Sequence, residues 1–262
     1  MMSSSSEFRI VTYNIHKCRG YDLKVVPERI IAVIREFDAD ILCLQEVVNL
    51  PAESHVPGKW GMQGTSNIFD QAGEIGRAFP EYASAFGVNR PFRGGTYGNM
   101  TLTRMKLRGW RNHDVSRLGR ERRGVLETEL ETENGIALHV FNVHLGTGHM
   151  ERRFQARRLI GGRILTHGGF NGPRLVIGDF NEWTRGLTTR LLRKSFKTVR
   201  PRHAAQVPRS YPGLLPLLSL DHCYYEPPLE LEETRLWRTR TALVASDHLP
   251  LVADFRIGDA AV

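Results

Sequence analysis

The sequence predicts an α/β (α+β) fold in which two β-sheets pack face to face and helices cover the outer faces. Runs of strand length, rich in apolar, β-branched and aromatic residues, are far more numerous than helical patterns. Because few helices are available to cover so many strands, sheet-on-sheet packing must bury the remaining apolar faces. The predicted strands cover residues 8–15, 39–47, 82–88, 99–107, 124–131, 136–145, 174–181, 219–226 and 249–257.

The clearest strand and hairpin lie in the middle of the chain. Leu126, Thr128 and Leu130 alternate with glutamates at 127, 129 and 131, which is the period of a strand with one wet face. The tight link 132–135 then leads into the next run, as in a β-hairpin. The least patterned stretch, residues 49–64, is predicted to be a surface loop near the ends of the strands.

Three stretches have helical periodicity. Pro27 suits a first helical turn, and an apolar stripe follows it at spacings of three and four through residue 37. Residues 150–167 repeat this pattern, with arginines on the opposite face, and residues 187–196 form a third, shorter candidate. No repeat, long linker or composition break divides the chain, so one domain over residues 8–258 is expected.

The composition limits the class of protein. No apolar run approaches the roughly 18 residues of a membrane span, and the start, residues 1–7, contains four serines in a row rather than a secretory signal. We therefore expect a disordered tail, no stable membrane insertion and a cytoplasmic protein, with a monomer as the simplest state. The three cysteines, without CxxC spacing, predict buried small hydrophobes rather than disulfides or a zinc site: Cys18, Cys43 and Cys223.

The chain is basic, with a formal net charge of +8 that comes largely from arginine clusters at 117–123, 152–163 and 190–202. Such a surface attracts polyanions. Arginines that merely solvate helix faces are an equally good interpretation, so charge alone does not identify the substrate.

Several predicted strands end abruptly in polar residues of one chemical kind. A carboxylate beside a strand core is costly unless it has a partner or a metal, so endings from distant parts of the chain predict one converging cleft. The endings are TYN at 12–14, LCLQE at 42–46, FNVH at 141–144, VIGDFN at 176–181, LD at 220–221 and SDHLP at 246–250.

Hydrolysis of a phosphoester needs this set of groups. A hard cation bound through oxygen ligands must neutralise the phosphate, and Asn14, Glu46 and Asp247 can supply those oxygens. The attacking water needs a base or an orienting acceptor, and developing charge needs donors. Asp179, Asn181 and the two histidines at 144 and 248 fit these tasks.

The motif series TYNIH, LCLQEV, FNVHL, VIGDFN, SLDH and SDHLPL resembles the endonuclease/exonuclease/phosphatase superfamily, which includes deoxyribonuclease I. The resemblance covers residues 8–255, with the motifs in the family's order. It implies a four-layer sandwich of two mixed β-sheets with helices outside, and one or two Mg²⁺ or Mn²⁺ ions.

The resemblance also implies roles for individual residues. Asn14 and Glu46 would lie at the main metal, with Asp247 beside it or at a second position. Asp179 would align the attacking water or act as base, and Asn181 would hold the water and the phosphate. His248 would donate to the phosphoryl oxygen, and Asp221 would be paired with it. His144 would bind phosphate or protonate the leaving oxygen.

Taken singly, each of these residues has an ordinary structural explanation, such as a turn cap, a surface ion pair or a satisfied buried histidine. Their joint arrangement favours the functional interpretation. Asn99, in a YGN segment that resembles the family's GN position, and Arg123 are weaker candidates for substrate contact. His16 and Lys17 follow Asn14 and could also reach the substrate, although a solvated residue is the better explanation for them, as it is for Arg123.

The pattern leaves the substrate open. Abasic-site endonucleases carry an acidic residue just after the TxN asparagine, whereas Ile15 and His16 follow here, so the chain looks more like a bacterial branch related to sphingomyelinases and small phosphodiesterases. A metal-dependent phosphodiesterase, with nucleic acid among its candidate substrates, is the leading hypothesis. The alternatives are a phosphomonoesterase or phospholipid headgroup hydrolase of the same fold, and a nonenzymatic polyanion-binding protein.

Overall fold

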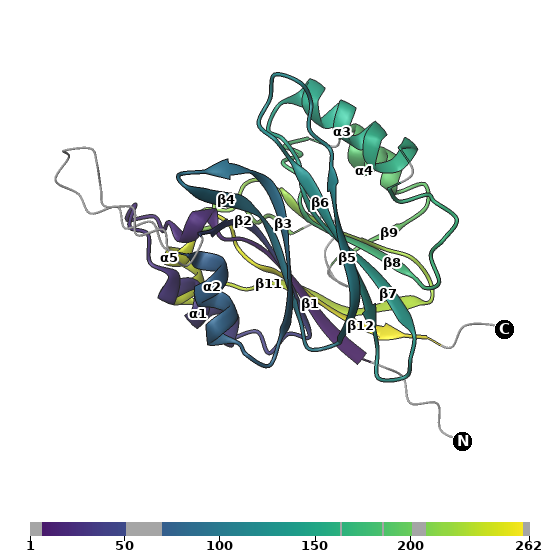
Figure 1. The fold of residues 1–262 in the computed structure, drawn as a ribbon, viewed down its shortest axis with the longest axis horizontal. Helices are drawn as coiled ribbons and strands as arrows, with labels where there is room; N and C mark the ends of the chain where they lie inside the picture. The colour runs from purple at the N-terminus through teal and green to yellow at the C-terminus, as the bar shows by residue number, and fades with distance from the viewer. Residues whose placement is uncertain (1–6, 51–69, 163, 185, 201–207, 259–262) are drawn as a thin grey trace.

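The computed structural model describes residues 7–50, 70–162, 164–184, 186–200 and 208–258. Two six-stranded sheets pack face to face, with helices on both outer sides (Figure 1). This confirms the predicted sandwich. None of the helices in these residues is long and apolar enough to cross a bilayer.

The first sheet has the strand order β11-β12-β1-β2-β4-β3. It is mixed, because β1 and β2 run parallel while the other neighbours are antiparallel. Its strands are β1 Glu7–Asn14, β2 Ile41–Asn49, β3 Ala83–Phe92, β4 Gly95–Thr103, β11 Leu229–Leu236 and β12 Leu251–Ile257.

The second sheet has the order β5-β6-β7-β8-β10-β9, and it is also mixed, with β7 parallel to β8. The link at 132–135 forms the predicted hairpin between β6 and β7. The strands are β5 Lys106–Asp114, β6 Gly124–Glu131, β7 Ala137–His144, β8 Arg174–Asp179, β9 Lys197–Thr198 and β10 Asp221–Tyr225.

Helices cover each sheet from outside (Figure 1). The first sheet packs against α1 Pro27–Arg35, α2 Gln71–Ala78 and α5 Arg240–Ala245, and a short 3-10 turn, η1 His16–Cys18, follows β1. The second sheet packs against α3 His149–Gly161 and α4 Leu187–Leu192. A third apolar cluster fills the space between the two sheets.

The structure corrects several predicted boundaries. The run at 99–107 is divided between β4 and β5, and the helix expected at 150–167 ends at Gly161, because two consecutive glycines do not favour its continuation. Glu7, assigned to the tail, pairs with Arg256 as the first residue of β1. Of the loop predicted at 49–64, residues 51–64 lie outside the described residues, as do residues 1–6 of the tail.

Candidate active site

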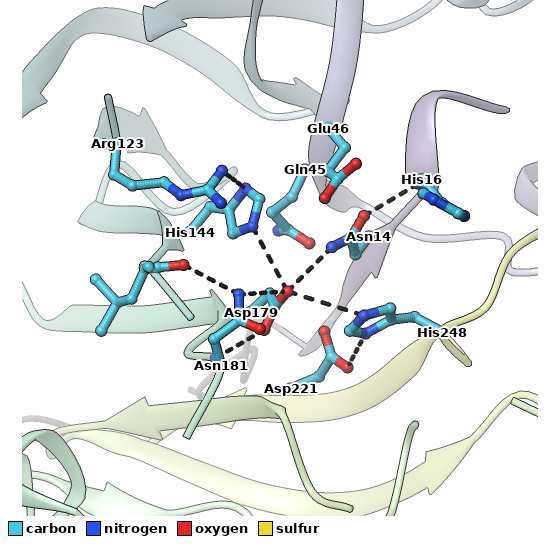
Figure 2. A network of polar contacts seen from close by, with 12 residues as sticks. Asn14, His16, Gln45, Glu46, Arg123, His144, Asp179, Asn181, Asp221 and His248 are labelled. Atoms are coloured by element: carbon cyan, nitrogen blue, oxygen red, sulfur yellow. Dashed lines mark hydrogen bonds and ion pairs between the residues drawn. The ribbon is translucent and has the colours of Figure 1, made fainter. Parts of the chain in front are cut away.

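The polar ends of the strands lie between the sheets because side-chain alternation carries them there. On β8, Leu175 and Ile177 point into the inter-sheet core, so Asp179, two residues further on, has the same direction. The same period takes β1 from Ile10 to Asn14 and β7 from Val140 to His144. The polar cluster is therefore a continuation of the inter-sheet core at the end of the sandwich (Figure 2).

Glu46 reaches this cluster through an irregularity in β2. The register with β4 shifts between Leu44 and Val47, and Glu46 has a left-handed φ of 61°. An extra residue in a strand redirects the side chain there, and such bulges are common beside active sites. Consequently both Gln45 and Glu46 point toward the cluster, instead of one of them facing outward (Figure 2).

The backbone requires glycine at the first position of the GDFN motif, Gly178. Its φ is +146°, and a Cβ atom built on it would lie 2.0 Å from the carbonyl oxygen of Val143 on β7. Only glycine allows this close approach. The approach sets Asp179 directly opposite His144 in the register of β7 and β8.

Asp179 is the residue on which most of the site converges. Its Oδ2 accepts hydrogen bonds from Asn14 Nδ2 at 3.0 Å and Asn181 Nδ2 at 3.3 Å, and its Oδ1 accepts one from the Asn181 backbone N–H at 2.8 Å. The ring nitrogens Nε2 of His144 and His248 lie 3.7 and 3.9 Å from Oδ2. Asn181 holds this geometry with a left-handed φ of 48° and a bond from its amide to the carbonyl of Leu145.

Burial is the main influence on the Asp179 carboxyl group. It raises the pKa of Asp179 to about 7, with the nearby Asp221 adding to this and His248 opposing it. Two carboxylates in one buried site cannot both ionise freely. Asp179 is thereby poised to exchange a proton near neutral pH.

His248 is oriented by a carboxylate, as the motif comparison implied. Its Nδ1 lies 2.8 Å from Asp221 Oδ2, and that oxygen also accepts a bond from the Ser210 hydroxyl at 2.5 Å. Burial alone would lower the pKa of His248, but Asp221 and Asp179 raise it to about 10. The Tyr211 ring packs on the imidazole, with centroids 4.9 Å apart.

His144, in contrast to His248, is uncharged. Burial and the guanidinium of Arg123 hold the pKa of His144 well below its ordinary value, so the ring is neutral. Arg123 Nη1 lies 3.5 Å from His144 Nδ1 and 3.5 Å from the Tyr97 hydroxyl. This places the predicted Arg123 inside the cluster as a buried cation whose Nε has no hydrogen-bond partner among the described residues.

Asn14, Glu46 and Asp247 supply the oxygen atoms expected of a metal site. Asn14 Oδ1 lies on the Glu46 side of the cluster (Figure 2) and accepts a bond from the His16 N–H at 3.0 Å. Glu46 accepts a bond from Lys17 Nζ. Burial would raise the pKa of Glu46, but the charge of Lys17 lowers it to about 2. The segment that carries Asp247 is joined to Asn14, because Ser246 Oγ donates to the Asn14 carbonyl at 2.8 Å. The Asp247 carboxylate is 3.4 Å from His16 Nδ1.

This donor set fits a hard cation that needs few protein ligands. Among the described residues, no three His, Cys, Asp or Glu side chains are arranged to hold a metal ion together. Mg²⁺ is bound in many proteins through one or two carboxylates, with water and substrate phosphate completing its shell. An ionised, partly buried Glu46 beside an amide oxygen matches that pattern.

Asn99 is the predicted contact that the structure places elsewhere. Its side chain is fully buried, and its amide donates to the backbone carbonyls of Asn142 at 3.0 Å and Gly124 at 3.3 Å. With no exposed surface it supports the wall of the site, and the expectation of a substrate contact is corrected accordingly.

Asn99 belongs to a buried amide network that joins the two sheets. Asn142 Nδ2 on β7 donates to the carbonyls of Leu44 and Met100 on the first sheet, at 3.1 and 3.0 Å, and Gln45 Nε2 donates back to Asn142 Oδ1 at 2.8 Å. Asn142 was not among the residues predicted to form the site. The signal was present, since a polar residue inside the apolar run FNVH needs a buried partner.

Two further residues were missed for a different reason. Ser210 and Tyr211 contact Asp221 and His248, yet they lie outside every predicted strand and motif. Only the fold shows that the segment before β10 returns to the site.

Comparison with known proteins identifies the family of this chain. A model of the Endonuclease/Exonuclease/phosphatase family matches residues 11–248. The uncharacterized protein YbhP of Escherichia coli strain K12 is 31% identical over 253 residues, covering 95% of this chain and 96% of YbhP.

Two solved structures illustrate the shared fold. The endonuclease/exonuclease/phosphatase from Beutenbergia cavernae has a TM-score of 0.75 at 20% identity, over 96% of this chain and 72% of that one. The mannosyl-6-phosphatase of Bacteroides thetaiotaomicron has a TM-score of 0.71 at 15% identity, over 95% and 99%. The chain belongs to the endonuclease/exonuclease/phosphatase family, which indicates a phosphoester hydrolase.

Proposed function

We propose that this protein is a divalent-metal-dependent phosphodiesterase that hydrolyses its substrate by in-line attack of an activated water. The observation that carries this proposal is the convergence on one Asp179 oxygen. Asn14 of the first sheet, Asn181 after β8, His144 of β7 and His248 before β12 all lie within 3.9 Å of Oδ2. A carboxylate held this firmly can align a water molecule against a phosphorus atom.

We assign one or two Mg²⁺ or Mn²⁺ ions to Asn14, Glu46 and Asp247. Such an ion would neutralise the phosphate and polarise its oxygen when bound.

The protein's own residues divide the remaining tasks. Asp179 is the better base, because its pKa of about 7 suits proton acceptance whereas His248 already carries its proton. Attack forms the new P–O bond, the water proton goes to Asp179, and the ester oxygen leaves on the opposite side. His248, held by Asp221, donates to the phosphoryl oxygen, and the neutral His144 adds a second hydrogen bond. Arg123 contributes positive charge on the His144 side.

The test is hydrolysis of bis-para-nitrophenyl phosphate, a soluble diester, with Mg²⁺, with Mn²⁺ or with EDTA. We expect turnover that needs the metal and that is lost in Asp179→Asn. The monoester para-nitrophenyl phosphate serves as the second substrate. Preference for it would favour a phosphomonoesterase, such as the structural neighbour named above. Absence of metal-dependent turnover on either ester, together with unchanged polyanion binding in Asp179→Asn, would favour the nonenzymatic alternative.

A further inference from the structure

Three large apolar side chains project from one short loop beside the catalytic residues. In the segment 211–218, here called the leucine loop, Leu214, Leu215 and Leu217 are 52%, 68% and 58% exposed. A single exposed leucine is ordinary, whereas several close together indicate a surface that contacts something apolar.

The leucine loop is a closed structure. The Tyr211 N–H donates to the Leu218 carbonyl at 3.0 Å, and the Leu218 N–H donates back to Tyr211 at 2.8 Å. The Leu217 N–H also donates to the Tyr211 carbonyl at 2.9 Å. The backbone at the base of the loop is therefore paired internally, while the side chains of Leu214, Leu215 and Leu217 are exposed.

The base of the leucine loop is fixed to the catalytic residues. Ser210 donates to Asp221, the Tyr211 ring packs on His248, and the Gly213 N–H donates to the Asp247 carbonyl at 2.8 Å. A surface that binds these leucines would therefore be held at a constant position relative to Asp221, Asp247 and His248.

Neighbouring segments extend the apolar surface along the edge of the site. The Leu214 N–H donates to the Tyr21 hydroxyl at 3.3 Å, which brings up the turn that carries Leu23, 67% exposed. On the other side Leu217 lines a cavity of about 270 Å³ together with Trp183, which is 54% exposed. We call this surface the apolar rim, comprising Leu23, Trp183, Leu214, Leu215 and Leu217.

A segment rich in arginine borders the site on the His144 side. The segment 115–123 enters the site through Arg123, which faces His144, and it also carries Arg117, Arg120 and Arg122. Arg120 and Arg122 are exposed to solvent, and Arg122 lies near enough to Asp114 to act on its charge. The chain as a whole has a net charge of +8, so this face complements an anionic surface.

We infer that this face docks on an anionic phospholipid membrane and presents the catalytic residues to a phosphodiester in a lipid headgroup. Leucines that enter the boundary between headgroups and acyl chains, beside arginines that meet the lipid phosphates, are the two elements of interfacial binding. A polynucleotide offers phosphates for the arginines but nothing for the leucines, because single-strand binding uses aromatic stacking. The identity of the substrate rests on the proposed function, whereas the docking surface does not.

The experiment is flotation with vesicles of phosphatidylcholine alone and vesicles containing one-third phosphatidylglycerol. We expect the protein to float with the anionic vesicles and at least tenfold less with the neutral ones. The triple variant Leu214→Ser, Leu215→Ser, Leu217→Ser should bind the anionic vesicles at least tenfold more weakly, yet hydrolyse bis-para-nitrophenyl phosphate at the wild-type rate. Trp110→Thr, which removes a 54% exposed side chain from β5, is the matched control and should float like the wild type.

The outcomes separate the two proposals. Flotation that is equal in the triple variant and the wild type, or retention on plasmid DNA but not on vesicles, would overturn the docking surface. The single variant Leu215→Glu, whose charge repels anionic lipid, provides the same test if the triple variant fails to fold. Loss of vesicle binding with normal hydrolysis of the soluble ester supports docking and leaves the proposed chemistry intact. Docking without hydrolysis of any ester would instead overturn the lipid substrate.

Discussion

The second sheet carries two clusters of histidines and carboxylates, one on each face. The inner cluster, between the sheets, contains His144, Asp179 and Asp221 of the second sheet and is completed by His248, which precedes β12 of the first sheet. The outer cluster, on the helix-covered face, contains His113 of β5, Glu127 of β6 and His139 of β7. There Glu127 Oε2 lies 2.6 Å from His113 Nε2, Glu127 Oε1 lies 3.7 Å from His139 Nδ1, and His139 Nε2 lies 2.8 Å from Asn171 Oδ1.

The pKa values of Glu127 and Asp179 are shifted in opposite directions. Burial would raise the pKa of both, yet the two histidines lower the pKa of Glu127 to about 2, whereas Asp179 rises to about 7. Glu127 faces only nitrogen partners, while Asp179 shares its site with the like charge of Asp221. Residue types alone therefore do not distinguish a stabilising cluster from a reactive one. The more complete burial of Asp179 and the second buried carboxylate beside it do.

The largest expected effect is that of Asp179→Asn in the inner cluster. The amide keeps the shape of the side chain but cannot accept a proton, so kcat should fall about 10²–10⁴-fold. Since the raised pKa means that the ionised Asp179 opposes folding, the thermal unfolding midpoint should not fall. Turnover and thermal unfolding monitored by circular dichroism measure the two quantities. Near wild-type turnover in a folded variant would remove Asp179 from the mechanism.

A smaller loss is expected for Asp221→Asn, because this residue acts through His248. We expect kcat to fall about tenfold to 100-fold with little change in KM, since the histidine loses the charge that holds it protonated and oriented. Steady-state kinetics on the soluble diester give both parameters. A rise in KM at constant kcat would instead make Asp221 a group for substrate binding.

Glu127→Gln in the outer cluster should leave activity unchanged and lower stability by about 1.5–3 kcal/mol, the usual range for a hydrogen bond to a charged group. Glu127 has a depressed pKa, so its contribution is present above its ordinary value of 4.5 and is lost as the pH falls toward 2. The pKa of His139 is raised because Glu127 and Asn171 outweigh the effect of burial, so its contribution is present below 6.5 and is lost as the pH rises through the folded pKa.

The difference in unfolding free energy between the wild type and Glu127→Gln should therefore be greatest between pH 4.5 and 6.5. Urea unfolding at several pH values measures it. A difference that grew steadily above pH 7, or a loss of turnover in the variant, would contradict the separation of the two clusters.

The parts of the fold that were predictable are those in which one face of a strand is buried. β6, β7 and β8 were found within one or two residues of their ends, because their apolar residues and polar endings are both in the sequence. β5 and β11 were missed. Both are edge strands with much exposed surface, in which charged and polar residues outnumber the apolar ones. Pairing with one neighbouring strand therefore determines their structure more than their own composition does.

The candidate site followed the same logic. Residues that continue the inward face of a predicted strand, such as Asn14, His144 and Asp179, could be named from sequence. The bulge that turns Glu46 inward could not be foreseen, since it depends on the register with β4. The contacts of Ser210 and Tyr211 were hidden for a related reason, because they arise from a loop that returns across the sheet.

The buried amide network affects the temperature at which the protein is inactivated. Asn14 and Glu46 belong to one sheet and His144 and Asp179 to the other, so catalysis requires that neither sheet slide over its partner. Asn142, Gln45 and Asn99 prevent that sliding with directional bonds that the surrounding aliphatic side chains cannot supply. Consider a variant in which these three amides are replaced by apolar residues of similar size. Both sheets would form, but on warming they would lose their alignment with each other. Turnover would then stop at a temperature where the secondary structure is still complete.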